Sequence, residues 1–204
     1  MKQAEKYTTR DKIMQAAEVL FMKKGFKATT IRTIAKEAKV NIALINYHFK
    51  SKEELYKELI LIKSTMLSSK LDEIVKDNSL NGGEKLDKLI HTYAEFIYSN
   101  PNIARFLVSE MTMESEVARW IIKRYISKIF GKIMLIIKQA YDDGFIRSDI
   151  DISVLLPSIM GSIVINVVAF PMLQILFKKK PDELFKSKKR VEEIKDVIFN
   201  GIKK

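Results

Sequence analysis

Apolar residues recur at three- and four-residue spacing along most of this chain, and no stretch shows sustained two-residue alternation. The first pattern is typical of helices that bury one face, whereas the second would indicate strands. Four helices are predicted in the first 66 residues. The apolar stripes expected to face a core are Ile13, Ala16, Ala17, Leu20 and Phe21; Ile31, Ile34, Ala35 and Ala38; Val40, Leu44, Ile45 and Phe49; and Leu55, Leu59, Ile62 and Met66.

The ends of these helices carry residues that cap helices well. Ser, Thr, Asn and Asp side chains accept hydrogen bonds from the first N–H groups of a helix, and glycine favours its C-terminal end. The two middle helices are short and joined by a tight turn, which is the arrangement of a helix-turn-helix. The expected caps and turns are Thr8 or Thr9, Thr29 or Thr30 and Asn41 as N-caps, Gly25 as a stop, Lys39 and Val40 as the turn, and Ser51 with Glu54 as a capping box.

The rest of the chain also has helical spacing. Residues 78–83 (NSLNGG) form the clearest break. The helices expected after it cover residues 84–98, 103–111, 116–141, the region 152–177 and 191–202, with a basic loop around Pro181. The sequence therefore predicts an all-α fold.

Charge is distributed unevenly along the chain. Residues 1–60 hold 13 Lys/Arg and 7 Asp/Glu, a net charge of +6, whereas residues 61–177 hold 13 of each. Residues 178–204 hold 10 Lys/Arg and 5 Asp/Glu, a net charge of +5. A basic excess at the N-terminal end suits a polyanion such as DNA. The alternative is a lysine-rich surface that only keeps the protein soluble.

An uncharged run at residues 152–177 is followed by Lys178, Lys179 and Lys180. About 20 apolar residues can span a membrane, so a membrane-anchored protein that uses residues 152–180 is an alternative. Two prolines interrupt the run, and small or polar residues recur along one face, which favours close helix packing. We therefore expect a buried or dimer-forming helix. The interrupting residues are Pro157 and Pro171, and the small or polar ones are Ser158, Ser162 and Asn166.

The third predicted helix can read DNA. An α-helix fits the major groove, and the second helix of a helix-turn-helix presents its N-terminal residues to base edges. Asparagine can pair with adenine, small apolar groups can meet a thymine methyl group, and longer polar groups reach phosphates. The groove-facing candidates are Asn41, Ile42, Ala43, Asn46, Tyr47 and His48; the phosphate candidates are Thr30, Tyr47, His48 and Lys52; and Arg32 could do either.

Each of these residues has a simpler alternative. Tyr47 could be half-buried in the core, and His48 could bond a backbone carbonyl. A single exposed asparagine or lysine is usually only solvated. The stripe, the turn and both caps occur in the order that a three-helix head needs, and this joint pattern favours DNA binding.

The pattern T-T-I-R-x-I-A-x-x-A-x-V-x-x-x-x-I-x-Y-H-F-x-S-K-E-x-L closely resembles the N-terminal DNA-binding domain of the TetR (tetracycline repressor) family, over roughly residues 8–60. The resemblance implies a helix-turn-helix domain at residues 1–52 and a helical effector-binding and dimerisation domain at residues 53–204. It further implies a homodimer that represses by binding a palindromic DNA operator and is released by a small-molecule effector. Two residues depart from the family pattern: Lys39 replaces a common glycine in the turn, and Asn46 replaces a common aromatic residue.

An effector pocket, if the resemblance holds, would lie within residues 84–177, and apolar lining would favour a hydrophobic effector. Aromatic residues at helical spacing are more often core packing than ligand contacts. Dimerisation is expected through residues 152–177 and 191–202. The candidate pocket residues are Tyr93, Phe96, Arg105, Phe106, Glu110, Trp120, Tyr125 and Asn166.

An enzyme is not expected. Gly82 and Gly83 lack the spacing of a phosphate-binding loop and follow no strand. His91 has no cysteine or paired carboxylates at ligand spacing, so we expect a helix-surface residue and no metal or cofactor. The chain has no cysteine, which fits a cytoplasmic protein. A helical protein that binds small molecules but has lost its DNA activity is a third reading.

Overall fold

The computed structural model describes residues 8–112, 116–178, 180 and 188–202. Within these residues the chain forms helices and no strand, as the hydrophobic spacing predicts. The contacts divide the chain into two compact units, residues 1–63 and 64–204. The boundary expected after residue 52 coincides with the start of helix α4, whereas the two units divide inside this helix.

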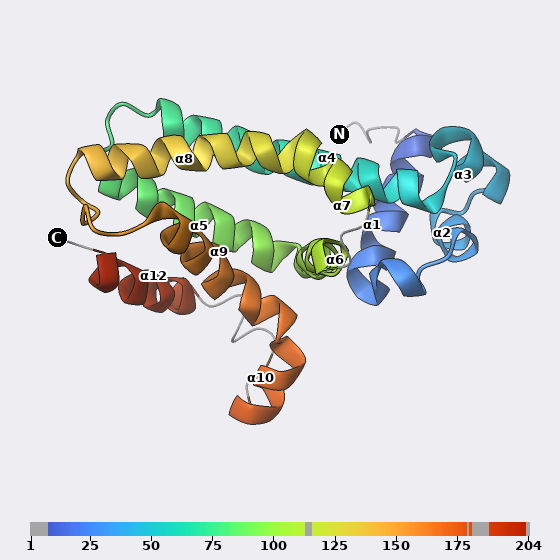
Figure 1. Ribbon diagram of the computed structural model, residues 1–204. Coiled ribbons are helices and arrows are strands. Elements are labelled where there is room, and N and C mark those ends of the chain that lie inside the picture. Colours follow the sequence, from blue (N-terminus) through green and yellow to red (C-terminus); the bar gives the residue numbers. More distant parts are fainter. Residues whose placement is uncertain (1–7, 113–115, 179, 181–187, 203–204) are drawn as a thin grey trace, which may run out of the picture. The chain divides into compact units, whose positions relative to one another are not determined.

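The first unit is a small helical head (Figure 1). Its first three helices, one long and two short, pack against one another in pairs, and the first part of α4 belongs to the same unit. The helices are α1 (Thr9–Ala28), α2 (Ile31–Ala38), α3 (Ile42–Phe49) and α4 (Lys52–Lys76).

The predicted caps of the head are present, with two differences. Thr8, Thr30 and Asn41 are N-caps whose side chains accept backbone N–H groups. Gly25 has φ 80° and breaks α1 instead of ending it, so the helix resumes up to Ala28. The second difference concerns the predicted Ser51–Glu54 capping box. The Ser51 hydroxyl accepts the Glu54 N–H at 3.1 Å, as in such a box, but the Glu54 carboxylate accepts from Lys57 at 2.8 Å.

The core of the head contains the predicted α1 stripe, and Ile45 and Phe49 fill it from α3. The prediction that Leu44 faces this core is wrong, because its side chain is 39% exposed. With only two turns, α3 can bury one narrow stripe, and Leu44 lies about 100° around the helix from Ile45. Ile62 and Met66 of α4 are also exposed, contrary to the prediction.

Beyond Leu59, the buried face of α4 differs from the predicted one: Leu67 is buried where Met66 was expected. Residues 59–62 are all apolar, so spacing alone leaves two possible faces, and packing selects the one that contains Ile60. The buried side chains further along α4 are Leu67, Leu71 and Ile74.

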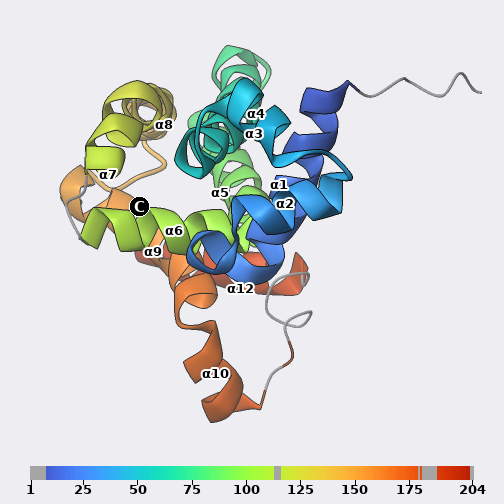
Figure 2. The ribbon, with the colours of Figure 1, turned by 90° about the vertical axis from the view of Figure 1, so that its right-hand side faces the viewer.

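The second unit is the larger of the two, and its helices pack around a core of their own (Figures 1 and 2). The predicted helix at 116–141 is present as α7, a π-helical turn η1 and α8. Its helices beyond α4 are α5 (Gly82–Ser99), α6 (Pro101–Thr112), α7 (Glu116–Ile121), η1 (Ile122–Ile126), α8 (Ser127–Asp142), α9 (Ile152–Val168), α10 (Phe170–Phe177) and α12 (Lys188–Ile202). The loop expected around Pro181 lies outside the described residues.

Helices α5 and α8 pack most closely where α5 begins. An added Cβ at Gly82 would lie 2.4 Å from Ala140 Cα, and one at Gly83 would lie 2.5 Å from the Phe145 ring. The Gly82 N–H donates to Asp143 Oδ2 at 2.5 Å. These glycines therefore allow a close contact between the start of α5 and the end of α8. Their role in the structure is packing.

Two lysines hold the second half of α4 within this unit. Lys85 of α5 is buried and donates to the Val75 carbonyl at 2.9 Å. Lys132 of α8 donates to the Ser68 carbonyl at 3.0 Å and to Asp72 Oδ2 at 2.5 Å. Hydrogen bonds from a cation are stronger than neutral ones, so these contacts fix α4 against α5 and α8.

The uncharged run forms two helices, α9 and α10, that bend by 74° at Ala169. Pro171 has no N–H to bond the carbonyl of Val167, four residues earlier. Arg105 of α6 donates its Nε–H to this carbonyl at 3.2 Å, which satisfies it. In the described part of the chain no single helix is long and apolar enough to cross a membrane, and the bent pair α9–α10 qualifies only by length and composition.

Candidate nucleic-acid interface

The turn between α2 and α3 has the hydrogen bonds of a Schellman motif. The Val40 N–H donates to the Ala35 carbonyl at 3.0 Å, and the Lys39 N–H donates to the Lys36 carbonyl at 3.2 Å. Lys39 sits at the left-handed position, with φ 55° and ψ 45°, where glycine is usual. A side chain there costs about 1 kcal/mol, and it places an exposed cation beside the start of α3.

Asn41 is the N-cap of α3, the helix predicted to read DNA. Its Oδ1 accepts the Ala43 N–H at 2.9 Å, which satisfies one of the first N–H groups of the helix. This oxygen is engaged within the chain, so the side-chain N–H groups of Asn41 are the ones that remain to face a groove. The Thr30 hydroxyl oxygen is likewise engaged within the chain, because it accepts the Thr33 N–H at 3.1 Å as the cap of α2.

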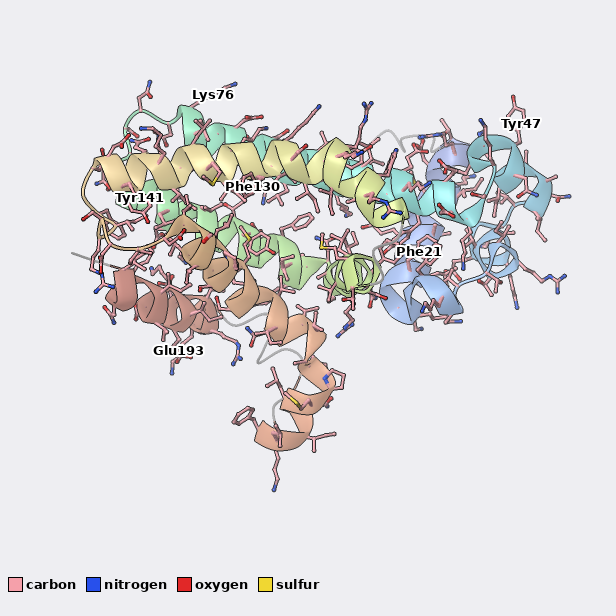
Figure 3. The ribbon with its side chains drawn as sticks, in the orientation of Figure 1. Phe21, Tyr47, Lys76, Phe130, Tyr141 and Glu193 are labelled. Atoms are coloured by element: carbon pink, nitrogen blue, oxygen red, sulfur yellow. The ribbon has the colours of Figure 1, made fainter. Side chains whose placement is uncertain are left out.

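Most of the remaining candidate residues are exposed at the surface of the first unit. Tyr47 is 81% exposed, so the alternative that it is half-buried packing is wrong, and Figure 3 shows its side chain projecting outward from α3. His48 is half-buried, and its ring lies edge-on to the Tyr47 ring with a centroid distance of 5.2 Å. We call the five exposed side chains of α2 and α3 that the sequence proposes for DNA contact the recognition face: Arg32, Ile42, Ala43, Asn46 and Tyr47.

Lys52 differs most from its predicted role. Its ammonium donates to the carbonyls of Phe26 and Thr29 at 2.9 and 3.0 Å, and it lies 4.2 Å from the centre of the Phe26 ring. An ammonium group has three N–H donors, and two of them are used here. Lys52 therefore ties the start of α4 to the end of α1. Its contact with a phosphate stays a prediction that depends on the third donor.

Replacement of Lys52 tests this structural role. We expect Lys52→Ala to lower the free energy of unfolding by about 1–2 kcal/mol, because two carbonyls lose a charged donor and Phe26 loses its cation. Lys50→Ala is the matched control, because Lys50 is exposed and two residues away. Urea unfolding followed by circular dichroism measures both, and equal stability of the two variants would contradict the role.

Two polar side chains among the predicted effector residues, Arg105 and Asn166, already have hydrogen-bond partners within the second unit. Arg105 is bonded to Val167 and Asn102, and buried Asn166 donates to the Ser162 carbonyl at 2.6 Å and accepts from Arg190 Nε at 3.1 Å. Neither side chain therefore needs a ligand to satisfy it.

The aromatic candidates lie in several surroundings. Tyr93 and Phe96 pack against the core of the second unit, and burial raises the pKa of Tyr93 well above its ordinary value. Phe106 is half-buried, whereas Trp120 is partly exposed and lies edge-on to Tyr125 with a centroid distance of 5.3 Å. The Glu110 side chain lies outside the described residues.

A surface pocket of about 610 Å³ in the second unit contains none of these candidates. Most of its lining side chains are charged, and they come from α4 and the residue that follows it, from α5 and from α12. Lys88 of α5 pairs with Asp77 across the pocket at 3.3 Å. His91 lies in it, with Nδ1 2.9 Å from the Asp87 carbonyl and Nε2 2.7 Å from Glu192 Oε1. These contacts join α5 to α12, so His91 is a bridging residue on the surface of its helix.

Two family models match the chain. The model of bacterial regulatory proteins of the tetR family matches residues 13–59, and the model named "Tetracyclin repressor-like, C-terminal domain" matches residues 83–198. The chain belongs to the TetR family. The resemblance seen in the recognition helix is confirmed, and the protein is a DNA-binding transcriptional regulator and not an enzyme.

Known TetR-family relatives and structures are similar over much of the chain. The probable transcriptional regulator YttP of Bacillus subtilis is 33% identical over 135 residues, which is 66% of this chain and 65% of YttP. The nucleoid occlusion factor SlmA of Aliivibrio fischeri is 30% identical over 184 residues, 86% of this chain and 89% of SlmA. The structure of KstR2 of Mycobacterium tuberculosis has the same fold, with a TM-score of 0.70 and 22% identity over 99% of this chain and 97% of KstR2.

Proposed function

We propose that this TetR-family protein is a homodimeric cytoplasmic repressor that binds a palindromic operator and is released by a small-molecule effector. The recognition face carries this proposal, because one short helix after a tight turn exposes two small apolar groups, an amide and a phenol. These are the groups that read base edges and contact phosphates. A relative, KstR2 of Mycolicibacterium smegmatis, is named a transcriptional repressor.

Exposed lysines around the recognition face support binding to the DNA backbone. Lys36 and Lys39 follow Arg32 along α2 and the turn, and Lys50 follows α3. Each cation that neutralises a phosphate releases counterions, so affinity depends steeply on salt. Lys50 was not among the residues predicted from the sequence, although its position directly after the recognition helix is the signal that could have found it.

Release by an effector requires that the effector bind one state of the protein better than another. In a two-fold dimer the heads read half-sites about 34–36 Å apart, so a small change in head spacing removes one head from its groove. Helix α4 is the natural carrier of this change, because it contributes residues to both units. An effector that moves α5 or α8 would act on α4 through Lys85 and Lys132.

The effector class that the second unit favours is hydrophobic. Tyr93, Phe96 and Met160 are half-buried and pack against an aliphatic core. A ligand that enters among them would gain chiefly from the burial of apolar surface, with few polar groups to orient it. Arg105 and Asn166 would take part only by giving up their internal partners.

Asn46 is the residue expected to read a base. Asn46→Ala should relax the preference at one base position of each half-site, because the loss of a bidentate contact to adenine removes about 1–3 kcal/mol of discrimination. The consensus is measured by selection of bound DNA from a random pool, with Asn78→Ala, an exposed asparagine of the second unit, as the matched control. An unchanged consensus for Asn46→Ala would remove the base-reading role and leave Asn46 as a solvated residue.

A further inference from the structure

Four charged or titratable side chains attach the N-terminal half of α12 to α5. Asp87 and His91 come from α5, and Glu192 and Lys195 come from α12. His91 Nε2 lies 2.7 Å from Glu192 Oε1, and Lys195 Nζ lies 2.9 Å from Asp87 Oδ1. Both pairs join one helix to the other. We call these four residues the α5–α12 clasp.

Both ring nitrogens of His91 face hydrogen-bond acceptors. Nδ1 lies 2.9 Å from the Asp87 carbonyl oxygen and 3.3 Å from Asp87 Oδ2, on the side of the ring opposite Glu192. Carbonyl and ionised carboxylate oxygens only accept hydrogen bonds, and a neutral imidazole has a single N–H. A neutral ring therefore satisfies one side only, whereas the imidazolium donates to both. The geometry requires the protonated form of His91.

The charge balance of the clasp leads to the same conclusion. Asp87 and Glu192 each carry a negative charge, and Lys195 contacts both carboxylates. One ammonium group cannot neutralise two carboxylates. Protonated His91 supplies the second positive charge, so the clasp is then neutral overall. Loss of the proton leaves one negative charge in excess between the two helices.

The other charged groups beside the clasp do not supply this second positive charge. Lys70 of α4 pairs with Glu95 at 2.9 Å, and Lys88 of α5 pairs with Asp77 at 3.3 Å. Glu73 of α4 lines the same pocket as His91 and adds a negative charge there. Nearby negative charges favour the protonated form of a histidine. The surroundings therefore support the imidazolium.

These contacts set the direction of the pH dependence. Burial lowers the pKa of His91, but the bonds to the Asp87 carbonyl and to Glu192, with the charges of both acids, raise it to above its ordinary value of 6.5. Hydrogen bonds to Glu192 and Asp87 raise the pKa of Lys195, so Lys195 stays protonated. The folded chain binds the His91 proton more tightly than the unfolded chain. The contribution of His91 to stability is therefore complete below pH 6.5 and is lost as the pH rises through the pKa of His91 in the folded chain.

We propose that the clasp is a pH-sensitive attachment of α12, in which protonated His91 holds the N-terminal half of the helix on α5 and loss of the proton loosens it. The C-terminal half is held differently, because Phe199 and Ile202 are buried in the core of the second unit. A rise in pH therefore loosens one half of α12 and leaves the other in place. Histidine is the side chain that changes charge near neutral pH, so the second unit responds to pH in that range. This response depends on neither DNA nor an effector.

The chain has two histidines, so His91 can be titrated directly. NMR spectra of the full-length protein with isotope-labelled histidine, recorded between about pH 5 and pH 9, give the pKa of each ring. The signal that is missing from His91→Gln belongs to His91. We expect the pKa of His91 in the wild type to lie above 6.5.

Two variants of α12 test the contact between the helices. Glu192→Gln should lower the pKa of His91, because the amide that replaces the carboxylate has no charge. Glu193→Gln is the matched control. Glu193 is the next residue of α12, is exposed and pairs with Lys189 at 3.7 Å. The pKa of His91 in this control should equal that of the wild type.

Amide hydrogen exchange measures whether the proton controls α12. After correction for the intrinsic exchange rate, protection of residues 191–198 in the wild type should fall by about threefold or more between about pH 6 and pH 8. Residues 199–202 should keep their protection. His91→Gln is uncharged at both pH values, so its protection of residues 191–198 should not change with pH.

Three results would overturn the proposal. A pKa of His91 at or below 6.5 would show that folding does not favour the imidazolium. An equal pKa in the wild type and Glu192→Gln would remove the contact with α12. Equal protection of residues 191–198 at both pH values would show that His91 titrates without loosening the helix. None of these results bears on the proposed binding of DNA, which selection of bound DNA tests separately.

Discussion

Gly82→Ala is expected to lower the free energy of unfolding of the second unit by about 3 kcal/mol or more. The added Cβ would lie 2.4 Å from Ala140 Cα and 2.5 Å from Ala140 N, which are backbone atoms of α8 and cannot rotate away. The start of α5 would have to move away from α8, and the bond from the Gly82 N–H to Asp143 would lengthen. Urea unfolding followed by circular dichroism measures the loss.

Gly131→Ala provides the control for this substitution. Gly131 lies inside α8 and is exposed, and an added Cβ there meets no atom within 4 Å. Alanine in a helix interior is more stable than glycine by about 0.5–1 kcal/mol, so this variant should gain stability. Wild-type stability of Gly82→Ala would show that the two helices do not approach as closely as described.

Tyr47→Ala is expected to weaken binding to the selected operator by about tenfold to a hundredfold without a change in thermal stability. The side chain is 81% exposed, so the fold loses little packing when it is removed. In the proposed dimer both heads lose the contact, and a loss of about 0.7–1.4 kcal/mol per head corresponds to this range. Fluorescence anisotropy with labelled operator measures the dissociation constant.

Two companion measurements identify what Tyr47 contributes. Tyr47→Phe keeps the ring and removes the hydroxyl, so a loss equal to that of Tyr47→Ala would assign the effect to a phosphate contact of the hydroxyl. Tyr47 is uncharged, so the dependence of affinity on salt should stay unchanged, whereas Arg32→Ala should reduce its slope. Wild-type affinity of Tyr47→Ala would mean that the outward face of α3 does not meet DNA.

Much of the head was predictable because it depends on local chemistry. The α1 stripe and the caps Thr8, Thr30 and Asn41 follow from helical spacing and from side chains that accept backbone N–H groups. The left-handed turn at Lys39 was predictable in position, although lysine hides the glycine signal. The other exposed residues of α3 followed by elimination once Ile45 and Phe49 were assigned to the core, but the same reasoning wrongly placed Leu44 there.

Features that depend on distant contacts were not predictable. Apolar residues at 59–62 gave two possible faces for α4, and only the observed packing chose between them. Lys52 has the position of a phosphate contact, but Phe26 and Thr29 supply its partners from 23 residues away or more. Pro171 signalled the break in the uncharged run, whereas Pro157 lies inside α9 and does not interrupt it. Neither proline shows that Arg105 satisfies the carbonyl of Val167.

Selection of DNA from a random pool by the full-length protein tests the central claim most directly. The recognition face, presented twice by a two-fold dimer, predicts a palindromic consensus whose half-sites are centred about 34–36 Å apart. Binding to it should fall steeply with added salt. Enrichment of no sequence, or of a single half-site without its inverted copy, would contradict the account.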